Sequence, residues 1–115
     1  MSVRAYNFEV DGIYYNIIDE KNVEVTYKGS SFYEDEYKNE VFIPDSVTYN
    51  GVSYIVTSIG KNAFAYSDLK TITIGNNVKS VGDDAFSTCN LLASVTMGTA
   101  VQNVGKYAFY NCSYL

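Results

Sequence analysis

The chain has 115 residues, of which 47% are hydrophobic and 18% charged, the balance of one globular domain. Its formal net charge of −5 is opposite in sign to the surfaces that bind nucleic-acid backbones. With no histidine and only two cysteines, the chain has no histidine-based acid–base chemistry and cannot build a four-ligand zinc site from nitrogen and sulfur alone. We therefore expect no nucleic-acid partner, no metal and no cofactor.

The apolar runs of the chain are short. Runs such as Leu91-Leu92-Ala93 stay far below the ~20 residues of a membrane-spanning helix, so we expect a soluble chain without membrane insertion. The opening segment (MSVR) leads into polar and aromatic sequence rather than into the apolar core of a secretion signal. Localisation must therefore be inferred from other features.

The sequence of residues 1–55 predicts short strands joined by tight turns. Asp11-Gly12 and Asn50-Gly51 are each typical of a type I′ hairpin turn, because both central residues of that turn need a positive φ. Residues 23–27 (VEVTY) alternate between apolar and polar side chains, as a strand with one buried face does. The expected strands of this region cover residues 6–10, 13–18, 23–27, 46–49 and 52–56.

An acidic, tyrosine-rich segment separates these strands. Most of the acidic side chains and most of the tyrosines of the whole chain lie within residues 1–55. Residues 30–40 (SSFYEDEYKNE) have no clear period, so we predict a surface loop there. Tyrosine is enriched at binding sites but also packs well on sheets, so the loop has both a binding and a structural interpretation. The candidate residues of this binding loop are Tyr33, Glu34, Asp35, Glu36 and Tyr37.

The C-terminal half of the chain repeats a motif. Ile59-Gly60-x-x-Ala63-Phe64 recurs at residues 81–86 and 104–109, so the copies start at nearly equal intervals. The first two copies continue with an apolar pair, Ile72-x-Ile74 and Val95-x-Met97. A period in the twenties is typical of a solenoid, in which equivalent positions of successive units stack on one another.

Stacking of the copies predicts the core. Phe64, Phe86 and Phe109 take the same place in successive units, so we expect a ladder of rings. Cys89 and Cys112 share a second place, one unit apart, at a separation within the range of a disulfide. They are either reduced core side chains or a disulfide, and the first interpretation is favoured because a serine fills this place in the first copy.

The repeat also predicts how the backbone runs. The apolar pairs have the spacing of short strands, which we expect to stack as a parallel sheet with only short helical or 3₁₀ turns between them. The repeated glycine, at positions 60, 82 and 105, is expected to turn the backbone tightly or to adopt a positive φ. A half-copy of the strand segment at residues 41–47 indicates that the stack begins before the first full repeat.

Residues 41–115 resemble the BspA-like leucine-rich repeats, a Treponema-type family found largely on surface proteins of anaerobic bacteria. Gly75 and Gly98 depart from the family pattern by replacing its usual proline, and Ser67 replaces its first cysteine. The resemblance implies a mainly β fold with short helical or 3₁₀ turns. An N-terminal antiparallel β cap at residues 1–55 would be followed, at residues 56–115, by about two and a half repeats of a short right-handed solenoid with a parallel sheet.

The resemblance also implies a class of function. Such proteins are secreted or displayed on the bacterial cell surface and bind proteins or host surfaces without conserved catalytic machinery, so we expect a non-enzymatic adhesion module. The third copy reaches Leu115 before its strand, and we expect this open end either to self-associate or to be covered by further repeats. The alternatives are a purely structural segment of a longer surface protein and a carbohydrate-binding module, which exposed coplanar rings would favour.

The repeat strands supply a candidate binding face. Residues between and beside the buried apolar pairs point outward and form a polar patch, with one aromatic residue beside it. Solenoids present such faces to partners, although an ordinary threonine-rich sheet surface has the same pattern. The residues of this face are Phe42, Thr71, Thr73, Ser94 and Thr96.

Overall fold

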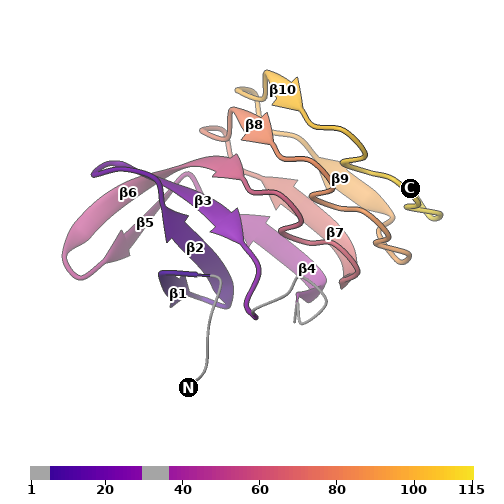
Figure 1. Ribbon diagram of the computed structural model, residues 1–115, viewed down its shortest axis with the longest axis horizontal. Coiled ribbons are helices and arrows are strands. Elements are labelled where there is room, and N and C mark those ends of the chain that lie inside the picture. The colour runs from indigo at the N-terminus through magenta and orange to yellow at the C-terminus, as the bar shows by residue number, and fades with distance from the viewer. Residues whose placement is uncertain (1–5, 30–36) are drawn as a thin grey trace.

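Strands arranged in two sheets make up the regular structure of the chain (Figure 1). The computed structural model describes residues 6–29 and 37–115. The strands within these residues are β1 (Phe8–Val10), β2 (Ile13–Ile17), β3 (Asn22–Thr26), β4 (Lys38–Ile43), β5 (Ser46–Tyr49), β6 (Val52–Ile59), β7 (Asp68–Ile74), β8 (Ser80–Val81), β9 (Ser94–Thr96) and β10 (Asn103–Val104). The mainly β fold with parallel strands is confirmed.

Two hairpins shape the N-terminal region, as predicted. β1 pairs antiparallel with β2 around Asp11 and Gly12, whose φ angles are 52° and 81°. β5 pairs antiparallel with β6 around Asn50 and Gly51, whose φ angles are 51° and 75°. Positive φ at both central residues is the geometry of the type I′ turn, which matches the twist of the flanking strands.

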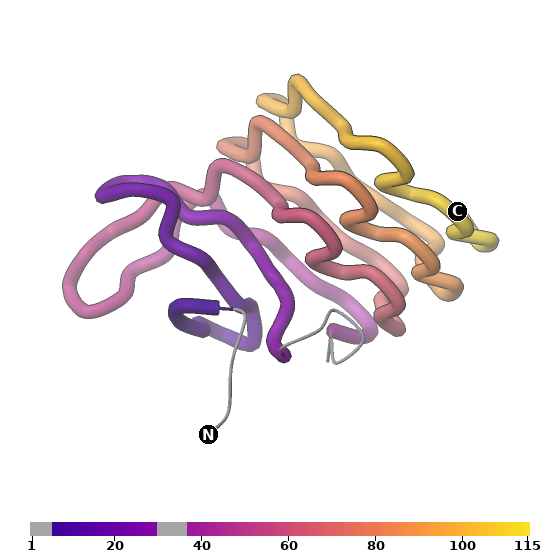
Figure 2. The backbone as a smooth tube through the Cα atoms, in the orientation of Figure 1, coloured from indigo at the N-terminus to yellow at the C-terminus, as the bar shows by residue number. Residues whose placement is uncertain are grey.

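The two sheets run side by side along the molecule. The large sheet has the order β1-β2-β3-β6-β8-β10, with β5 added to β6, and the small sheet has the order β4-β7-β9. In the large sheet β1, β2 and β3 are antiparallel, whereas β3, β6, β8 and β10 are parallel, as are all strands of the small sheet. Each turn of the solenoid therefore adds one strand to each sheet, and Figure 2 shows these turns as stacked rungs. β6 runs across position 55, so the cap and the repeats share one sheet.

Hydrogen-bonded turns connect the two sheets on each rung. The Ala63 N–H donates to the Gly60 carbonyl and the Ala65 N–H donates to the Asn62 carbonyl, both at 3.2 Å. Each of these bonds joins a residue to the third residue before it, as in a 3₁₀ turn, so the expected short turns are present. They stay isolated, and the described residues contain no α-helix or 3₁₀-helix. These turns also pair between rungs, since the Phe64 N–H donates to the Ala85 carbonyl at 2.7 Å.

The repeated glycines serve close packing rather than a positive φ. Positive φ values in these turns belong instead to non-glycine residues, such as Asn62 and Tyr66, at 60° and 63°. At Gly82, a Cβ atom would lie 2.7 Å from the Lys61 nitrogen and 2.8 Å from the Gly60 carbonyl carbon, which are both backbone atoms of the preceding rung. The expected positive φ is therefore wrong, whereas the expected tight turn does begin at this residue, because the Ala85 N–H donates to the Gly82 carbonyl. Glycine is required there because a side chain would push the rungs apart.

The ladder of phenylalanine rings forms the centre of the core. The rings of Phe64 and Phe86 stack with centroids 5.1 Å apart and an interplanar angle of 1°, and those of Phe86 and Phe109 with 5.1 Å and 3°. This separation is close to the ≈ 4.7–4.9 Å between neighbouring strands, so ring stacking and strand pairing have the same repeat distance. Phe64 and Phe86 are fully buried, whereas Phe109 is partly buried.

The two cysteines form a second ladder beside the rings. Both are free thiols. The Cys89 Sγ donates to the Phe64 carbonyl and the Cys112 Sγ donates to the Phe86 carbonyl, each at 3.0 Å. Burial raises the pKa of the Cys112 thiol, partly offset by a hydrogen bond from the Cys89 backbone. A raised pKa lowers the thiolate fraction, so the Cys112 thiol is less reactive than a cysteine with the ordinary pKa.

The stack of rungs begins within the cap. The Gly60 N–H donates to the Val25 carbonyl at 2.8 Å, just as the Gly82 N–H donates to the Ile59 carbonyl at 2.8 Å. The Tyr37 ring lies 4.4 Å from the Phe64 ring at 42°, and so precedes the phenylalanine ladder. β3 and β4 therefore take the places that β6 and β7 take on the next rung.

We expect Phe86→Ala to lower the free energy of unfolding by about 3–5 kcal/mol, because it empties a fully buried place between two rings. Phe109→Ala should cost clearly less, because the Phe109 ring is only partly buried. Chemical denaturation followed by circular dichroism measures both values. Equal costs for the two variants would contradict a ladder that is most tightly packed at Phe86.

Candidate functional site

The outer face of the small sheet brings the predicted face residues together. The register aligns Phe42 with Thr73, and Thr73 with Thr96, in one row across β4, β7 and β9. A second row aligns Thr71 with Ser94. The side chains between these rows, such as Ile72, are buried, which fixes the outward direction of the face residues.

Glu40 is a member of this face that the sequence analysis missed. It pairs in register with Thr71, so it begins the second row, and it is exposed. We had assigned residues 38–40 to a loop, but they belong to β4, and this expectation is corrected. Counting back in steps of two from Phe42 would have found Glu40, since alternate residues of a strand share a face.

Of the five candidate residues of the binding loop, only Tyr37 lies within the described residues. Tyr33, Glu34, Asp35 and Glu36 lie outside the described residues. Tyr37 is only 4% exposed, and its hydroxyl donates to the Thr26 carbonyl at 2.7 Å and accepts a hydrogen bond from the Tyr14 N–H at 2.9 Å. Tyr37 is therefore a core residue, and its assignment to an exposed binding loop is corrected.

Phe42 is the most exposed apolar side chain of the face. Its exposed fraction is 63%, although it lies within a strand. A hollow of about 350 Å³ lies on the side toward β7 and β9, where Thr73, Thr96 and Met97 line it together with Phe42. A larger cleft lies on the other side of Phe42.

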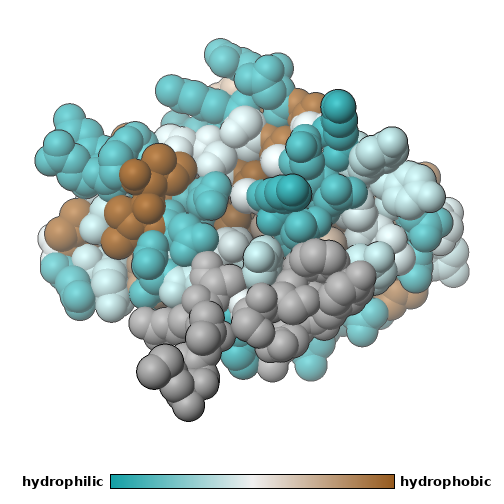
Figure 3. All heavy atoms as spheres, in the orientation of Figure 1, coloured by the Kyte–Doolittle hydropathy of each residue, from teal (hydrophilic) through white to brown (hydrophobic). Residues whose placement is uncertain are grey.

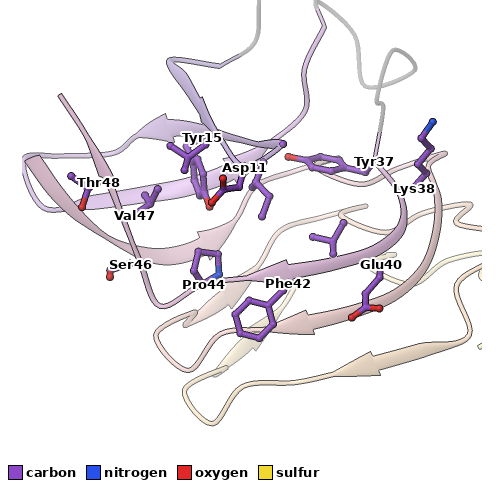
Figure 4. Close-up of a pocket in the computed structure, with 14 residues that line it drawn as sticks. Asp11, Tyr15, Tyr37, Lys38, Glu40, Phe42, Pro44, Ser46, Val47 and Thr48 are labelled. Carbon is purple, nitrogen blue, oxygen red and sulfur yellow. The ribbon is translucent and has the colours of Figure 1, made fainter. Parts of the chain in front are cut away.

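This cleft has a volume of about 720 Å³ and lies between β4, β5 and the β1–β2 turn (Figure 4). Buried apolar side chains and exposed polar side chains both line it, so it offers contacts to a ligand of mixed character. The apolar lining includes Ile13, Tyr15, Val41 and Val47, and the polar lining includes Asp11, Lys38, Glu40, Ser46 and Thr48. Figure 4 shows Glu40 and Phe42 on the opposite side of the β4 ribbon from Tyr15 and Asp11.

Tyr15 lines the cleft and has a pKa displaced from its usual range. Burial raises the pKa of Tyr15 well above its usual range, and the negative charge of Asp11 raises it further, so the phenol stays protonated. Glu24, whose pKa burial also raises, does not line the cleft. Among the described residues, no group of three histidine, cysteine, aspartate or glutamate side chains is placed to hold a metal ion.

A second exposed apolar area lies over the large sheet. Figure 3 shows a largely hydrophilic face with an apolar patch on its left side, where β3 and β6 lie. Ile17, Ile18 and Ile55 belong to this part of the chain and are each about half exposed or less. These side chains line neither of the two hollows beside Phe42, so Phe42 and its neighbours are the stronger candidate. The described part of the chain has no helix long and apolar enough to cross a bilayer.

Residues 57–115, slightly more than half of the chain, match the family described as BspA type leucine-rich repeat region. The chain belongs to this family of leucine-rich repeat proteins. No curated protein matches the sequence.

Solved structures of bacterial leucine-rich repeat proteins are similar over nearly the whole chain. A protein from Bacteroides ovatus is 31% identical over 96% of this chain and 28% of its own, with a TM-score of 0.81. A protein from Bacteroides capillosus is 26% identical over 94% of this chain and 77% of its own, also with a TM-score of 0.81. A leucine-rich cell surface protein from Faecalibacterium prausnitzii is 24% identical over 94% of this chain and 28% of its own, with a TM-score of 0.76. The chain therefore spans just over a quarter of the first and third of these proteins.

We expect Tyr37→Phe to lower the free energy of unfolding by about 1–3 kcal/mol, because the variant loses two hydrogen bonds in the core. Tyr114→Phe is the matched control, since Tyr114 is 72% exposed, and should change stability by no more than about 0.5 kcal/mol. Urea denaturation measures both variants. A neutral Tyr37→Phe would contradict the assignment of Tyr37 to the core.

Proposed function

We propose that this chain is a non-enzymatic module, secreted or displayed on the bacterial cell surface, that binds a protein ligand through the outer face of the small sheet. The observation that carries the proposal is Phe42, a ring with 63% exposure that stands between two hollows. Family membership supports the same class, because the repeat fold provides a rigid face rather than reactive groups.

The surroundings of Phe42 suit a binding hot spot. Burying an exposed phenylalanine side chain in an interface contributes about 1.5–3 kcal/mol to the free energy of binding. Aromatic residues are also enriched at the centres of interfaces. The strand pairing holds the backbone of Phe42 in register with that of Thr73, so little backbone freedom is lost on binding. The hollows on either side of the ring give a ligand the concave surfaces that shape complementarity needs.

A protein ligand fits this face better than a carbohydrate. A sugar-binding platform needs exposed, coplanar rings, but Tyr107 and Tyr110, two exposed rings in contact, meet at 78°. Phe42 has no exposed aromatic partner among the other residues that line its two hollows. A purely structural segment would have no need of an exposed ring on the outer face of a strand. Surface display is supported by the similar Faecalibacterium prausnitzii structure, which is that of a cell surface protein.

The test compares two variants, each of which replaces one exposed aromatic residue by alanine, on the same panel of ligands. The chain, Phe42→Ala and Tyr107→Ala are applied to arrays of purified secreted and cell-surface proteins and to a glycan array. Tyr107 is a matched control because it is 65% exposed but lies in the turns of the last rung. We expect proteins bound by the native chain to lose at least about tenfold in affinity with Phe42→Ala and to be unaffected by Tyr107→Ala.

Two results would count against the proposal. Protein ligands whose affinity is unchanged by Phe42→Ala would place binding elsewhere on the chain. Binding to glycans alone would favour the carbohydrate-binding alternative.

A further inference from the structure

We infer that the cleft beside β4 binds an extended segment of a partner protein, which adds to the small sheet as a further strand. The segment would carry apolar side chains toward the core and basic side chains toward the outer face. This inference rests on the proposed function and deepens it by naming the class of ligand. Three features of β4 carry it: a free edge, a cleft along that edge, and the charge of the lining.

β4 is the edge strand of the small sheet. The sheet has the order β4-β7-β9, and in the part of the chain that the structure describes β4 pairs with β7 alone. A strand paired on one side presents unpaired N–H and C=O groups on the other, which is the surface that an added strand recognises. Edge strands of this kind are usually short or covered, whereas β4 has six residues and opens on a cleft.

The cleft follows the backbone edge of β4 rather than one face of the sheet. Glu40, Val41 and Phe42 are consecutive, and all three line it. Since alternate side chains of a strand point to opposite faces, a space lined by three in a row must lie beside the strand. Ser46, Val47 and Thr48 of β5 line the same space in the same way, and β5 pairs with β6 alone among the described strands.

The ends of the edge set the length of the ligand. At one end Pro44 follows β4 and lines the cleft, and proline has no N–H to offer a partner strand. At the other end Asn39 has a φ of 61° and the register with β7 shifts between Asn39 and Glu40, so the regular edge begins at Glu40. From there to Ile43 it spans about 13 Å at ~3.3 Å per residue, which an added strand of about four residues fills.

The residues that line the cleft determine which side chains the added segment should carry. On the inner side, a ligand residue beside Val41 meets the buried side chains of Ile13, Tyr15 and Val47, which favour an apolar residue. On the outer side the neighbours are Glu40 and the exposed ring of Phe42. A lysine or arginine there pairs with the carboxylate and packs against the ring.

The charge of the cleft agrees with this pattern. Its two carboxylates, from Asp11 and Glu40, are both exposed, and its one ammonium group, from Lys38, stands at the start of β4. The net charge of the chain, −5, also favours the approach of a basic segment. An acidic segment would be repelled at the same positions.

The test uses a synthetic hexapeptide of alternating lysine and valine, acetylated, amidated and labelled with a fluorophore. Binding to the full chain is measured by fluorescence polarisation, beside a peptide of alternating glutamate and valine. Two further versions of the basic peptide carry N-methyl groups on one or the other set of alternating amides. A strand added to β4 uses only one set for hydrogen bonds to it, so N-methylation of that set blocks pairing and N-methylation of the other does not.

We expect the basic peptide to bind at least tenfold more tightly than the acidic one, and one N-methylated version to lose at least tenfold while the other binds as the parent does. Glu40→Gln should weaken binding several-fold, whereas Glu20→Gln, an exposed acid outside the cleft, should not. Equal binding of both charge types, or no difference between the two N-methylated versions, would overturn the inference.

Two further outcomes separate this inference from the proposed function. If a protein ligand depends on Phe42 but is not displaced by the basic peptide, the proposed function stands and the strand-addition inference fails. If light scattering finds a dimer that the peptide dissociates, the edge belongs to a second copy of the chain, and the partner-segment inference is likewise overturned.

Discussion

The stacking of one rung on the next is the constraint on which this structure depends. Three kinds of contact join successive rungs at nearly the same spacing. They are the stacked rings, whose centroids are 5.1 Å apart, the strand pairing in two sheets, and the hydrogen bonds between turns. A residue that widens one of these contacts therefore disturbs the others. This shared distance explains why Gly82 must lack a side chain and why the place of Cys89 takes only small residues.

The same constraint determines where the candidate site lies. The first rung is built from β3 and β4, and Tyr37 takes the place that a phenylalanine has on later rungs. On its outer side this rung has the β1–β2 hairpin, which pairs with β3 in the large sheet but leaves the edge of β4 in the small sheet unpaired among the described residues. The cleft, the exposed Phe42 and the free strand edge thus arise together where the regular stack begins.

The sequence predicted the features that depend on local or periodic signals. The two hairpins follow from Asp11-Gly12 and Asn50-Gly51, and the ring ladder follows from a motif that recurs at nearly equal intervals. Phe42, Thr71, Thr73, Ser94 and Thr96 of the outer face were found by the alternation along the strands. Met97 was predicted to belong to a buried apolar pair, but it follows the end of β9, is 40% exposed and lines the hollow beside this face. These signals are reliable because each residue needs only its neighbours, or its equivalents on other rungs, to specify its place.

Other features depend on contacts that no local pattern reveals. Tyr37 sits among acidic and polar residues, and only the tertiary contacts with Thr26 and Phe64 make it a core residue. Glu40 is different, because the alternation along the strand, counted back from Phe42, does predict its place on the outer face. The role of the repeated glycine was misjudged because the sequence shows that a side chain is absent but not whether torsion or close packing requires it. The cleft joins residues from three separate segments, so no single stretch of sequence predicts it.

The cap and the repeats form one continuous stack, joined where Tyr37 and Val25 meet the first repeat. Native-state hydrogen exchange, followed by mass spectrometry with increasing denaturant, measures whether this stack opens as a unit. We expect the amides of β3, β4, β6 and β7 to open with one common free energy and one common denaturant dependence. If β6 and β7 instead open while β3 and β4 remain protected, the cap and the repeats are separate units and do not form one stack.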